Sequence, residues 1–256
     1  MEAKKTELLF GIRPLLEAIK AGKTIEKIMI QNELKGELFK ELNQALKSGE
    51  KIPVQMVPKE ALNKISRENH QGIIAFVSAI EYYSIEQKVM ELFDAGKNPF
   101  VMVMDHITDV RNFGAIVRSA EAMGVNMIVI PTKGSARINA DAIKSSTGAI
   151  FHIPFCRIPN LIDAVDILKA LGIKIVSATE KGQLDVKDAD MTGPVALVMG
   201  SEEKGITKSI LKRSDMQVRI PLSGETASLN VSVAAGIMLA ELDRRRTSGR
   251  KSTKSK

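Results

Sequence analysis

Asn112 and Arg118 follow FVMVMD, an apolar run that predicts a buried strand, and they form the first of three motifs that could do chemistry. Asn112 is expected at or just before a helix start, with Arg118 six residues further on. Backbone N–H groups at a helix start favour a phosphate, and an arginine adds a charged fork for phosphate or ribose oxygens. The motif therefore predicts recognition of an anionic substrate. A capping Asn followed by a solvent-exposed Arg is the simpler alternative.

The second motif, VALVMGSEEKGI over residues 195–206, joins an apolar run to an acidic turn. Its two glycines lie five residues apart, as in a phosphate-binding loop, but Ile206 stands where that loop needs its lysine. Glu202 and Glu203 would also repel phosphate. The turn therefore suits a positively charged or hydroxyl-bearing ligand better than a nucleoside triphosphate. A glutamate at an ordinary helix start is the simpler alternative.

The third motif, IPLSGETASLNVSVAAG over residues 220–236, predicts a strand, a loop of small polar residues and a helix. Ser228 and Asn230 stand at the start of that helix, where either could serve only as a start signal. Residues 234–236 are Ala, Ala and Gly, and such small side chains permit close backbone contact. The third motif is the most specific of the three.

The elements around these motifs predict a doubly wound α/β domain. From Phe100 onward the predicted strands are continuous apolar runs, as expected when helices cover both faces of a parallel sheet. Such folds bind ligands at the carboxyl ends of their strands. The predicted strands are FVMVMD, NMIVIP, IKIVSAT, PVALVMG and MQVRIPL, and the predicted helices span residues 112–124, 139–149, 161–172, 207–213 and 228–246.

A smaller α/β module is expected before this domain. Helical and strand patterns alternate along residues 8–77, and Gly96 and Pro99 mark the start of the larger domain. The predicted helices span residues 8–22, 37–49 and 58–66, and the predicted strands span 27–31, 52–57 and 72–79. The expected division is a first domain over residues 1–77, a linker with one amphipathic helix over 78–96, a second domain over 97–246 and a flexible basic tail over 247–256.

The charge balance suits a polyanionic partner. Lysines and arginines exceed aspartates and glutamates by 37 to 30, which gives a net charge of +7 and an isoelectric point near 9.4. Such a balance steers a protein toward nucleic acid, although ordinary solubility would also account for it. Much of the excess lies in RRRTSGRKSTKSK, residues 244–256, which is expected to form a flexible arm. The rest of the chain is close to neutral, so nucleic acid would have to bind a local patch.

The cysteine and histidine positions argue against a metal site. Cys156 is the one cysteine, which excludes an internal disulfide and a cysteine cluster, and it is expected in or beside a strand. His70, His106 and His152 are scattered without metal-ligand spacing.

No stretch supplies the roughly 18 uninterrupted apolar residues of a membrane span, and the first residues do not resemble a leader. We expect a soluble, cytoplasmic protein.

Together, the three motifs resemble those of the SpoU (TrmH-like) RNA ribose 2'-O-methyltransferases of the SPOUT superfamily. The resemblance covers essentially the whole chain, and it implies methyl transfer from S-adenosylmethionine to a ribose 2'-hydroxyl of RNA. The catalytic residues that it implies are Asn112, Arg118, Glu202, Ser228 and Asn230. The residues that it implies for cofactor binding are Thr179, Gly182, Met199, Gly200, Ser201, Ile220, Pro221, Leu222, Ser228 and Leu229.

The resemblance also implies a trefoil knot in the carboxyl-terminal parallel-sheet domain, with the cofactor bound in the knot, and a homodimer joined through that domain. The smaller α/β domain resembles the ribosomal protein L30e-like substrate-binding domain of the subgroup that methylates a guanosine ribose in 23S rRNA. That likeness rests on FGIRPLLEAI at residues 10–19 and on HQGI at residues 70–73, where His70 would contact RNA or cap a turn. Arg118 would engage the 2'-hydroxyl or its adjacent phosphate. The acceptor of the hydroxyl proton stays open between Arg118 and Glu202.

Other functions are less consistent with the sequence. A tRNA ribose is the alternative substrate, but the simpler tRNA enzymes lack a comparable amino-terminal domain. A non-catalytic RNA-binding protein would not need all five polar residues. A hydrolase triad of Asp105, His106 and Ser228 is disfavoured because the first two are adjacent and no G-x-S-x-G turn occurs. With 4% aromatic residues and no Trp, we expect recognition of RNA shape and backbone more than base stacking.

Overall fold

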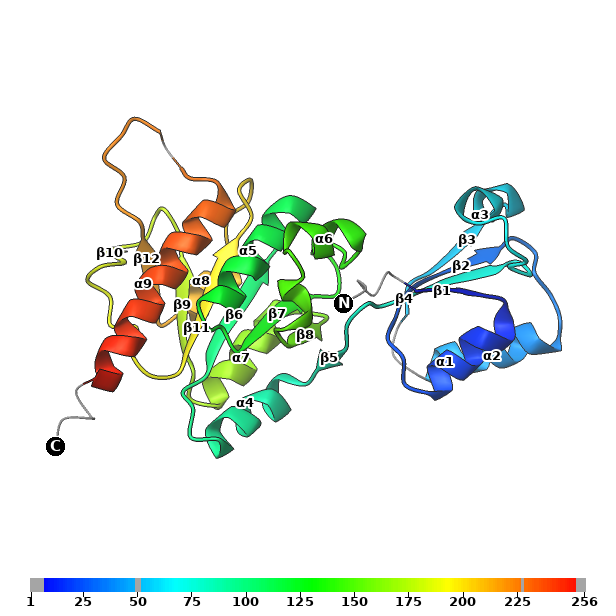
Figure 1. Ribbon diagram of the computed structural model, residues 1–256, viewed down its shortest axis with the longest axis horizontal. Helices are drawn as coiled ribbons and strands as arrows, with labels where there is room; N and C mark the ends of the chain where they lie inside the picture. The colour runs from blue at the N-terminus through cyan, green and yellow to red at the C-terminus, as the bar shows by residue number, and fades with distance from the viewer. Residues whose placement is uncertain (1–6, 49–51, 227, 252–256) are drawn as a thin grey trace. The chain divides into compact units, whose positions relative to one another are not determined.

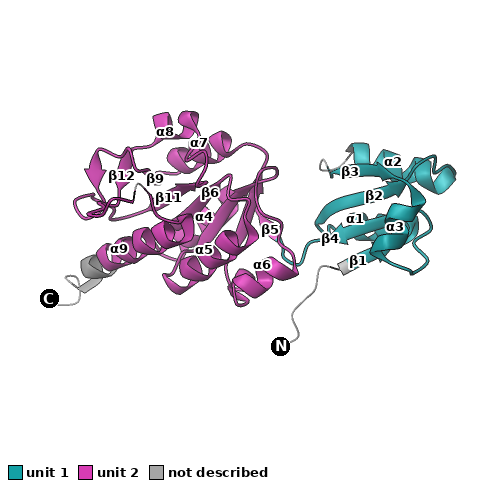
Figure 2. Cartoon of the chain, turned by 90° about the horizontal axis from the view of Figure 1, so that it is seen from above, with its two compact units in different colours: residues 1–81 teal, residues 82–256 magenta. Residues whose placement is uncertain are grey.

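The structure is a computed structural model that describes residues 7–48, 52–226 and 228–251. The chain divides into two compact units, one over residues 1–81 and one over residues 82–256 (Figure 2). Each unit contains a sheet of its own. Among the described residues, no helix is long and apolar enough to cross a membrane.

The first unit is a mixed four-stranded sheet with helices on both faces. Its elements are β1 (Glu7–Phe10), α1 (Ile12–Lys20), β2 (Ile25–Gln31), α2 (Glu37–Ser48), β3 (Val54–Val57), α3 (Lys59–Ile65) and β4 (Ile73–Val77). The strand order is β1-β4-β2-β3, in which β4 is antiparallel to β1 and β2, and β3 is parallel to β2. Helices α1 and α2 pack on one face around Leu15, Ile28 and Leu42, and α3 packs on the other through Leu62.

Residues 8–10 belong to strand β1, so the prediction of a helix from residue 8 is wrong at its start. Leu8 and Phe10 pack on the α3 side of the sheet and Leu9 packs on the opposite side, which is the alternation of a strand. Gly11, with a φ of 88°, separates β1 from α1. The apolar run of residues 8–10 is too short to distinguish the two-residue period of a strand from the period of a helix. In the sequence it therefore resembles the start of the amphipathic helix that follows. The other predicted elements of this unit are confirmed.

His70 closes a turn inside the first unit. The residue is 5% exposed, its Nδ1 accepts the Gly72 N–H at 3.0 Å, and its Nε2 lies 2.8 Å from Asn63 Oδ1. Because Nδ1 accepts, the ring proton is on Nε2, which donates to Asn63. The two residues after His70 both have positive φ, 49° at Gln71 and 79° at Gly72. Of the two roles expected for His70, the structure supports the turn cap.

The second unit is an eight-stranded sheet in which all paired strands run parallel, as predicted (Figure 1). The strand order is β10-β12-β9-β11-β6-β7-β8-β5. The strands are β5 (Tyr82–Tyr83), β6 (Phe100–Asp105), β7 (Met127–Pro131), β8 (Phe155–Ile158), β9 (Lys174–Ala178), β10 (Leu184–Asp185), β11 (Val195–Gly200) and β12 (Met216–Arg219). The helices are α4 (Ile85–Asp94), α5 (Val110–Ala122), α6 (Ala140–Ser145), η1 (Ala149–Phe151), α7 (Leu161–Ala170), α8 (Lys208–Arg213) and α9 (Val231–Lys251).

Helices cover both faces of this sheet (Figure 1). On one face, α4, α7 and α8 pack against strand residues such as Val101, Val103 and Val198. On the other face, α5 packs beside both α6 and α9. The contact of α5 with α6 is close, because a Cβ atom at Gly114 would lie 1.9 Å from Ser145 Oγ. Burial on both faces explains why the central strands are uninterrupted apolar runs.

The sequence does not predict strands β5 and β10, and for β8 it predicts only a strand at or beside Cys156, without its bounds. β5 and β10 are two residues long and therefore carry no periodic signal. β8 contains the buried Cys156, so the expectation of a strand at this cysteine is confirmed. The segment 78–96, expected to be a linker with a helix, contains β5, which pairs with β8, and α4, which Ser84 caps.

The end of α9 is held by arginines from the run expected to be a flexible arm. Arg245 Nη1 donates to Ala189 O at 2.8 Å, and Arg246 Nη1 donates to Gly193 O at 2.7 Å. The expectation of a flexible arm is therefore wrong for Arg245 and Arg246, which fix the helix to the loop before β11, and for Arg244, which is paired with Glu241 in the same helix. α9 itself continues to Lys251. The rest of the expected tail, residues 252–256, lies outside the described residues.

Glu241 connects these arginines to the helix. Its carboxylate accepts from Arg244 Nη2 and from Arg245 Nε, each at 2.7 Å. Hydrogen bonds from Arg244 and then Arg245 lower the pKa of Glu241 from its ordinary 4.5 to about 2. Because the folded pKa is depressed, the ionised carboxylate stabilises the fold above pH 4.5, and this stabilisation is lost as pH falls toward 2.

Glu241→Gln should lower the free energy of unfolding at pH 7 by about 1 kcal/mol, because it removes the charge that both arginines contact. The difference from the wild type should shrink between pH 5 and pH 3, where the wild type begins to lose the same interaction. Urea unfolding followed by circular dichroism at these pH values measures both effects. Glu121→Gln, on the exposed surface of α5, is the matched control, and an equal effect from it would contradict the assignment.

Candidate active site

The loops that carry the three motifs leave one edge of the second sheet. β12, β9, β11 and β6 are parallel neighbours in that order, so their carboxyl ends share this edge. The loop between β12 and α9, orange in Figure 1, contributes the third motif. The described loops at this edge comprise residues 106–109, 179–182, 201–207, 220–226 and 228–230.

Glu202 joins the three motifs through hydrogen bonds. Its Oε1 accepts from Asn112 Nδ2 at 3.2 Å, from Asn230 Nδ2 at 2.7 Å and from the Val231 N–H at 3.0 Å. Asn230 Nδ2 also donates to Asn112 Oδ1 at 3.1 Å. We call these four groups the Glu202 network. Hydrogen bonds to a carboxylate are stronger than those between neutral groups, so the network fixes loops that lie far apart in the sequence.

Both helices that enter the network are capped by side chains. Asn230 Oδ1 accepts the Ser232 N–H at 2.9 Å and so caps α9. Asp109 Oδ1 accepts the Asn112 N–H at 2.7 Å and caps α5. Asn112 is therefore the third residue of α5, and the prediction that it stands at or before the helix start is wrong. Because Asp109 makes the cap, the Asn112 amide remains available to Glu202.

A tight turn presents Glu202. The Gly205 N–H donates to Ser201 O at 2.9 Å, and the Lys204 N–H donates to Ser201 Oγ at 3.1 Å. A Cβ atom at Gly200 would lie 2.2 Å from the carbonyl carbon of Gly205. Any residue other than glycine would therefore force the backbone of this turn to move. The glycine that resembles part of a phosphate-binding loop is thus required by the packing of this turn.

Asp105 anchors the other side of the same turn and is a residue that the sequence did not assign to the site. It is 1% exposed, and its Oδ2 accepts the Thr207 N–H at 2.6 Å. Its Oδ1 lies 2.5 Å from Nδ1 of His106, whose φ is 59°. The sequence signal that could have identified Asp105 is an acidic residue at the end of an otherwise apolar strand. Adjacent Asp and His side chains do pair here, but Ser228 makes no hydrogen bond with either among the described residues.

Arg118 and Ser228 stand apart from the Glu202 network. Arg118 is exposed and forms no hydrogen bond or ion pair with the described residues. Arg118 lies six residues after Asn112, so the two side chains point about 120° apart around the axis of α5. Ser228 is also exposed, in the loop before α9. The structure therefore brings together Asn112, Glu202 and Asn230 and leaves Arg118 and Ser228 open to a ligand.

The segments expected to bind a cofactor lie at the carboxyl ends of β9, β11 and β12, and we call them the cradle. The Gly182 N–H donates to Thr179 O at 2.9 Å, and a Cβ at Gly182 would lie 2.5 Å from the Val218 carbonyl carbon, so this turn is pressed against β12. Leu222 is 42% exposed in the loop after β12. Exposed aliphatic surface beside backbone polar groups is suited to a flat, hydrogen-bonding ring such as adenine.

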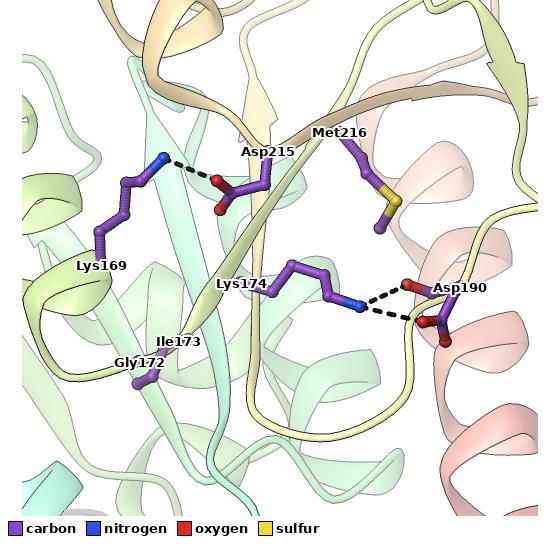
Figure 3. A pocket seen from close by; sticks show the side chains of 7 residues that line it. All are labelled: Lys169, Gly172, Ile173, Lys174, Asp190, Asp215 and Met216. Atoms are coloured by element: carbon purple, nitrogen blue, oxygen red, sulfur yellow. Dashed lines mark hydrogen bonds and ion pairs between the residues drawn. The ribbon is translucent and has the colours of Figure 1, made fainter.

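A cavity of about 460 Å³ lies at the opposite edge of the sheet (Figure 3). Its side chains are paired with one another: Lys169 Nζ lies 2.7 Å from Asp215 Oδ1, and Lys174 Nζ lies 3.3 Å from Asp190 Oδ2. Hydrogen bonds from Thr192, with Lys174 beside them, lower the pKa of Asp190 to about 2. The cavity borders the amino ends of β9 and β12, so it is separate from the motif residues.

The chain belongs to the SpoU rRNA methylase family. Residues 99–240, more than half of the chain, match the SpoU rRNA Methylase family, and residues 8–83 match the family described as RNA 2'-O ribose methyltransferase substrate binding. The methylase match lies within the second structural unit, and the substrate-binding match covers most of the first unit and ends two residues beyond it. The class of protein is therefore an RNA methyltransferase with a substrate-binding unit.

Individual relatives agree with this family. YacO of Bacillus subtilis, named as a TrmH family tRNA/rRNA methyltransferase, is 33% identical over 95% of this chain and 98% of its own. AviRb, a SpoU methyltransferase of Streptomyces viridochromogenes solved with AdoMet, is 27% identical, with a TM-score of 0.59 over 94% of this chain and 91% of its own. A TrmH/SpoU tRNA modifying enzyme of A. aeolicus is 28% identical, with a TM-score of 0.54 over 64% of this chain and 85% of its own.

Glu202→Ala should lower the free energy of unfolding by about 1–2 kcal/mol, because three donors lose their charged acceptor at once. Glu203→Ala should change it by less than about 0.5 kcal/mol. Glu203 is adjacent and exposed, and among the described residues it has no hydrogen-bond or ion-pair partner. Chemical denaturation of the two variants makes the comparison. Equal losses would mean that the Glu202 network does not hold the loops.

Proposed function

We propose that the protein transfers a methyl group from S-adenosylmethionine to a ribose 2'-hydroxyl of RNA, at a guanosine of 23S rRNA. The observation that carries the proposal is the Glu202 network, in which Asn112, Glu202 and Asn230 from three separate motifs meet beside the strand-end loops. The match of residues 8–83 to a substrate-binding family supports a large RNA substrate. The tRNA/rRNA naming of YacO leaves tRNA as the second candidate substrate.

The cradle at the carboxyl ends of β9, β11 and β12 is the proposed cofactor site. When bound, S-adenosylmethionine supplies a methyl group on a positively charged sulfur. Backbone groups would hydrogen-bond the adenine, and Leu222 and Leu229 would cover its faces. The contributing residues are Thr179, Gly182, Met199, Gly200, Ser201, Ile220, Pro221, Leu222, Ser228 and Leu229.

The polar residues divide into those that hold the loops and those that face the RNA. Glu202 Oε1 already accepts three hydrogen bonds, so we assign Glu202 to positioning the loops. Arg118 is exposed and without a partner among the described residues, so its guanidinium is assigned to the target ribose or its adjacent phosphate. Ser228 and Asn230 would order the loop against the ribose. In this assignment, these residues speed methyl transfer largely by holding the 2'-hydroxyl in line with the methyl donor.

A homodimer is proposed through α9. Val233 is 51% exposed and Ile237 39% exposed, four residues apart on one face of this helix, and Ala240 continues the face. A Cβ atom at Gly236 would meet nothing within 4 Å in this chain, so a second backbone could approach closely there. We also propose the trefoil knot in this unit.

The activity is tested by tritiated methyl transfer from S-adenosylmethionine to total RNA of a strain that lacks the gene. Primer extension at low dNTP then maps the product. A single methylated guanosine ribose in 23S rRNA is the expected outcome. Label in tRNA would keep the enzyme and change the substrate. Absence of label together with absence of cofactor binding by calorimetry would overturn the proposal in favour of a non-catalytic RNA-binding protein.

Arg118→Ala should lower turnover by about 100-fold or more while cofactor affinity stays within a few-fold, because the side chain faces RNA and not the cradle. Arg118→Lys should recover little, since an ammonium group lacks the planar fork. Single-turnover methyl transfer and calorimetric titration with S-adenosylmethionine measure the two quantities. Retained turnover in Arg118→Ala would end the proposed role.

Replacing both Val233 and Ile237 by Asp should convert the dimer to a monomer, because charges would be buried in the contact. Light scattering coupled to size-exclusion chromatography measures the mass. Met90→Asp, which changes a side chain 48% exposed on α4, is the matched control and should leave the dimer intact. A monomeric wild type, or a dimer that survives the double substitution, would contradict the α9 contact.

A further inference from the structure

We propose that RNA phosphates bind a second basic surface beside the motifs, the basic lip, which consists of Arg111, Lys133 and Arg137. Arg111 stands in the first turn of α5, and the other two stand in the loop of residues 132–139 between β7 and α6. None of the three is among the residues implied by the family motifs. The inference rests on the proposed function, because it says where RNA runs over the second unit.

The loop of residues 132–139 is fixed against the turn that begins the first motif. The Ala136 N–H donates to Ile107 O at 2.8 Å. Gly134 lies against the ring of His106, since a Cβ atom there would be 3.1 Å from His106 Cδ2. β6 and β7 are parallel neighbours, so the segments that follow them leave the same sheet edge. The lip is therefore at the edge that carries the Glu202 network.

The charged groups of the lip form no ion pair with a carboxylate among the described residues. The side chains of Arg111, Lys133 and Arg137 are exposed, and none of these side chains forms a hydrogen bond or ion pair with the part of the chain that the structure describes. The carboxylates of Asp105 and Asp109 nearby are each engaged with backbone N–H groups. Unpaired cations at an exposed edge gain most from a polyanion, because each phosphate they neutralise releases counterions.

Helix geometry makes the lip continuous with Arg118. Seven residues separate Arg111 from Arg118, which is close to two turns of α5, so the two side chains share one helix face about 10 Å apart along the axis. Both side chains are exposed. A strand of RNA whose target ribose lies at Arg118 can therefore follow α5 to Arg111 and continue to the loop.

The loop also contains a buried polar atom without a partner. Ser135 Oγ is the one buried side-chain oxygen or nitrogen among the described residues that makes no hydrogen bond. An unpaired buried hydroxyl destabilises a fold, and folded proteins contain few of them. Ser135 lies between Lys133 and Arg137, so a polar partner that binds the lip could relieve this cost by a small shift of the loop.

The chemistry of the lip fits an RNA backbone better than bases or an acidic protein surface. The loop sequence TKGSARIN has no aromatic side chain on which a base could stack. Asp141, exposed in the first turn of α6, is the nearest free carboxylate in the sequence and leaves the lip with a positive balance. Phosphate contacts of this kind position the RNA without reading its sequence.

The test combines Arg111→Gln, Lys133→Gln and Arg137→Gln in the full-length chain. Filter binding of an unmodified 23S rRNA transcript measures affinity across a salt series, independently of catalysis. The triple variant should bind about tenfold or more weakly, and its log–log salt slope should be shallower by about one for each phosphate that the variant no longer neutralises. The KM for RNA should rise, and turnover at saturating RNA should stay within about twofold.

The matched control removes three exposed lysines elsewhere in the second unit, with Lys97→Gln, Lys187→Gln and Lys212→Gln. It should keep the wild-type salt slope. A lip variant with the affinity and slope of the control would overturn the lip, even if the wild type methylates RNA. A wild type that binds RNA through the lip but transfers no methyl group would overturn the proposed function alone. Calorimetric cofactor binding and circular dichroism confirm that each variant is folded.

Discussion

The carboxylate of Glu202 is the interaction on which the candidate site depends. It accepts from two asparagine amides and from the N–H of Val231. Asn112 and Asn230 are 118 residues apart, and both helix starts are aligned by the same oxygen. A single charged acceptor can do this because each helix start is capped separately, by Asp109 and by Asn230 itself. The amides thus remain free to donate to the carboxylate.

The order of the parallel strands determines where the Glu202 network lies. Successive parallel strands present their carboxyl ends at one edge, so the sheet topology alone brings the loops after β6, β9, β11 and β12 to the same edge. Asp105 then connects the end of β6 to the far side of the Glu202 turn through Thr207. Gly200 allows that turn to fold onto itself. Arg118 and Ser228 lie outside this hydrogen-bonded scaffold and have exposed side chains, which suits groups that meet a substrate.

Much of this arrangement could be predicted from the sequence. Long apolar runs such as FVMVMD identified the parallel sheet, and polar residues after them identified the edge at which the motifs gather. The short strands β1, β5 and β10 and the cap at Asp109 were missed because their signals are too brief to show a helical or strand period. Hydrogen bonds between distant residues, such as Asn112 with Glu202, follow from topology, and no local pattern encodes them. The arginines at the end of α9 were misread because their partners are backbone carbonyls of another segment.

The most direct test of this account is a crystal structure of the protein with S-adenosylmethionine. We expect the cofactor to lie in the cradle, against residues 179–182, 199–201, 220–222 and 228–229, with its methyl group open toward Arg118. The hydrogen bonds of Glu202 to Asn112 and Asn230 should persist. A cofactor bound at the opposite sheet edge, beside Lys169 and Lys174, would contradict the account, as would a bound state in which Glu202 leaves both asparagines.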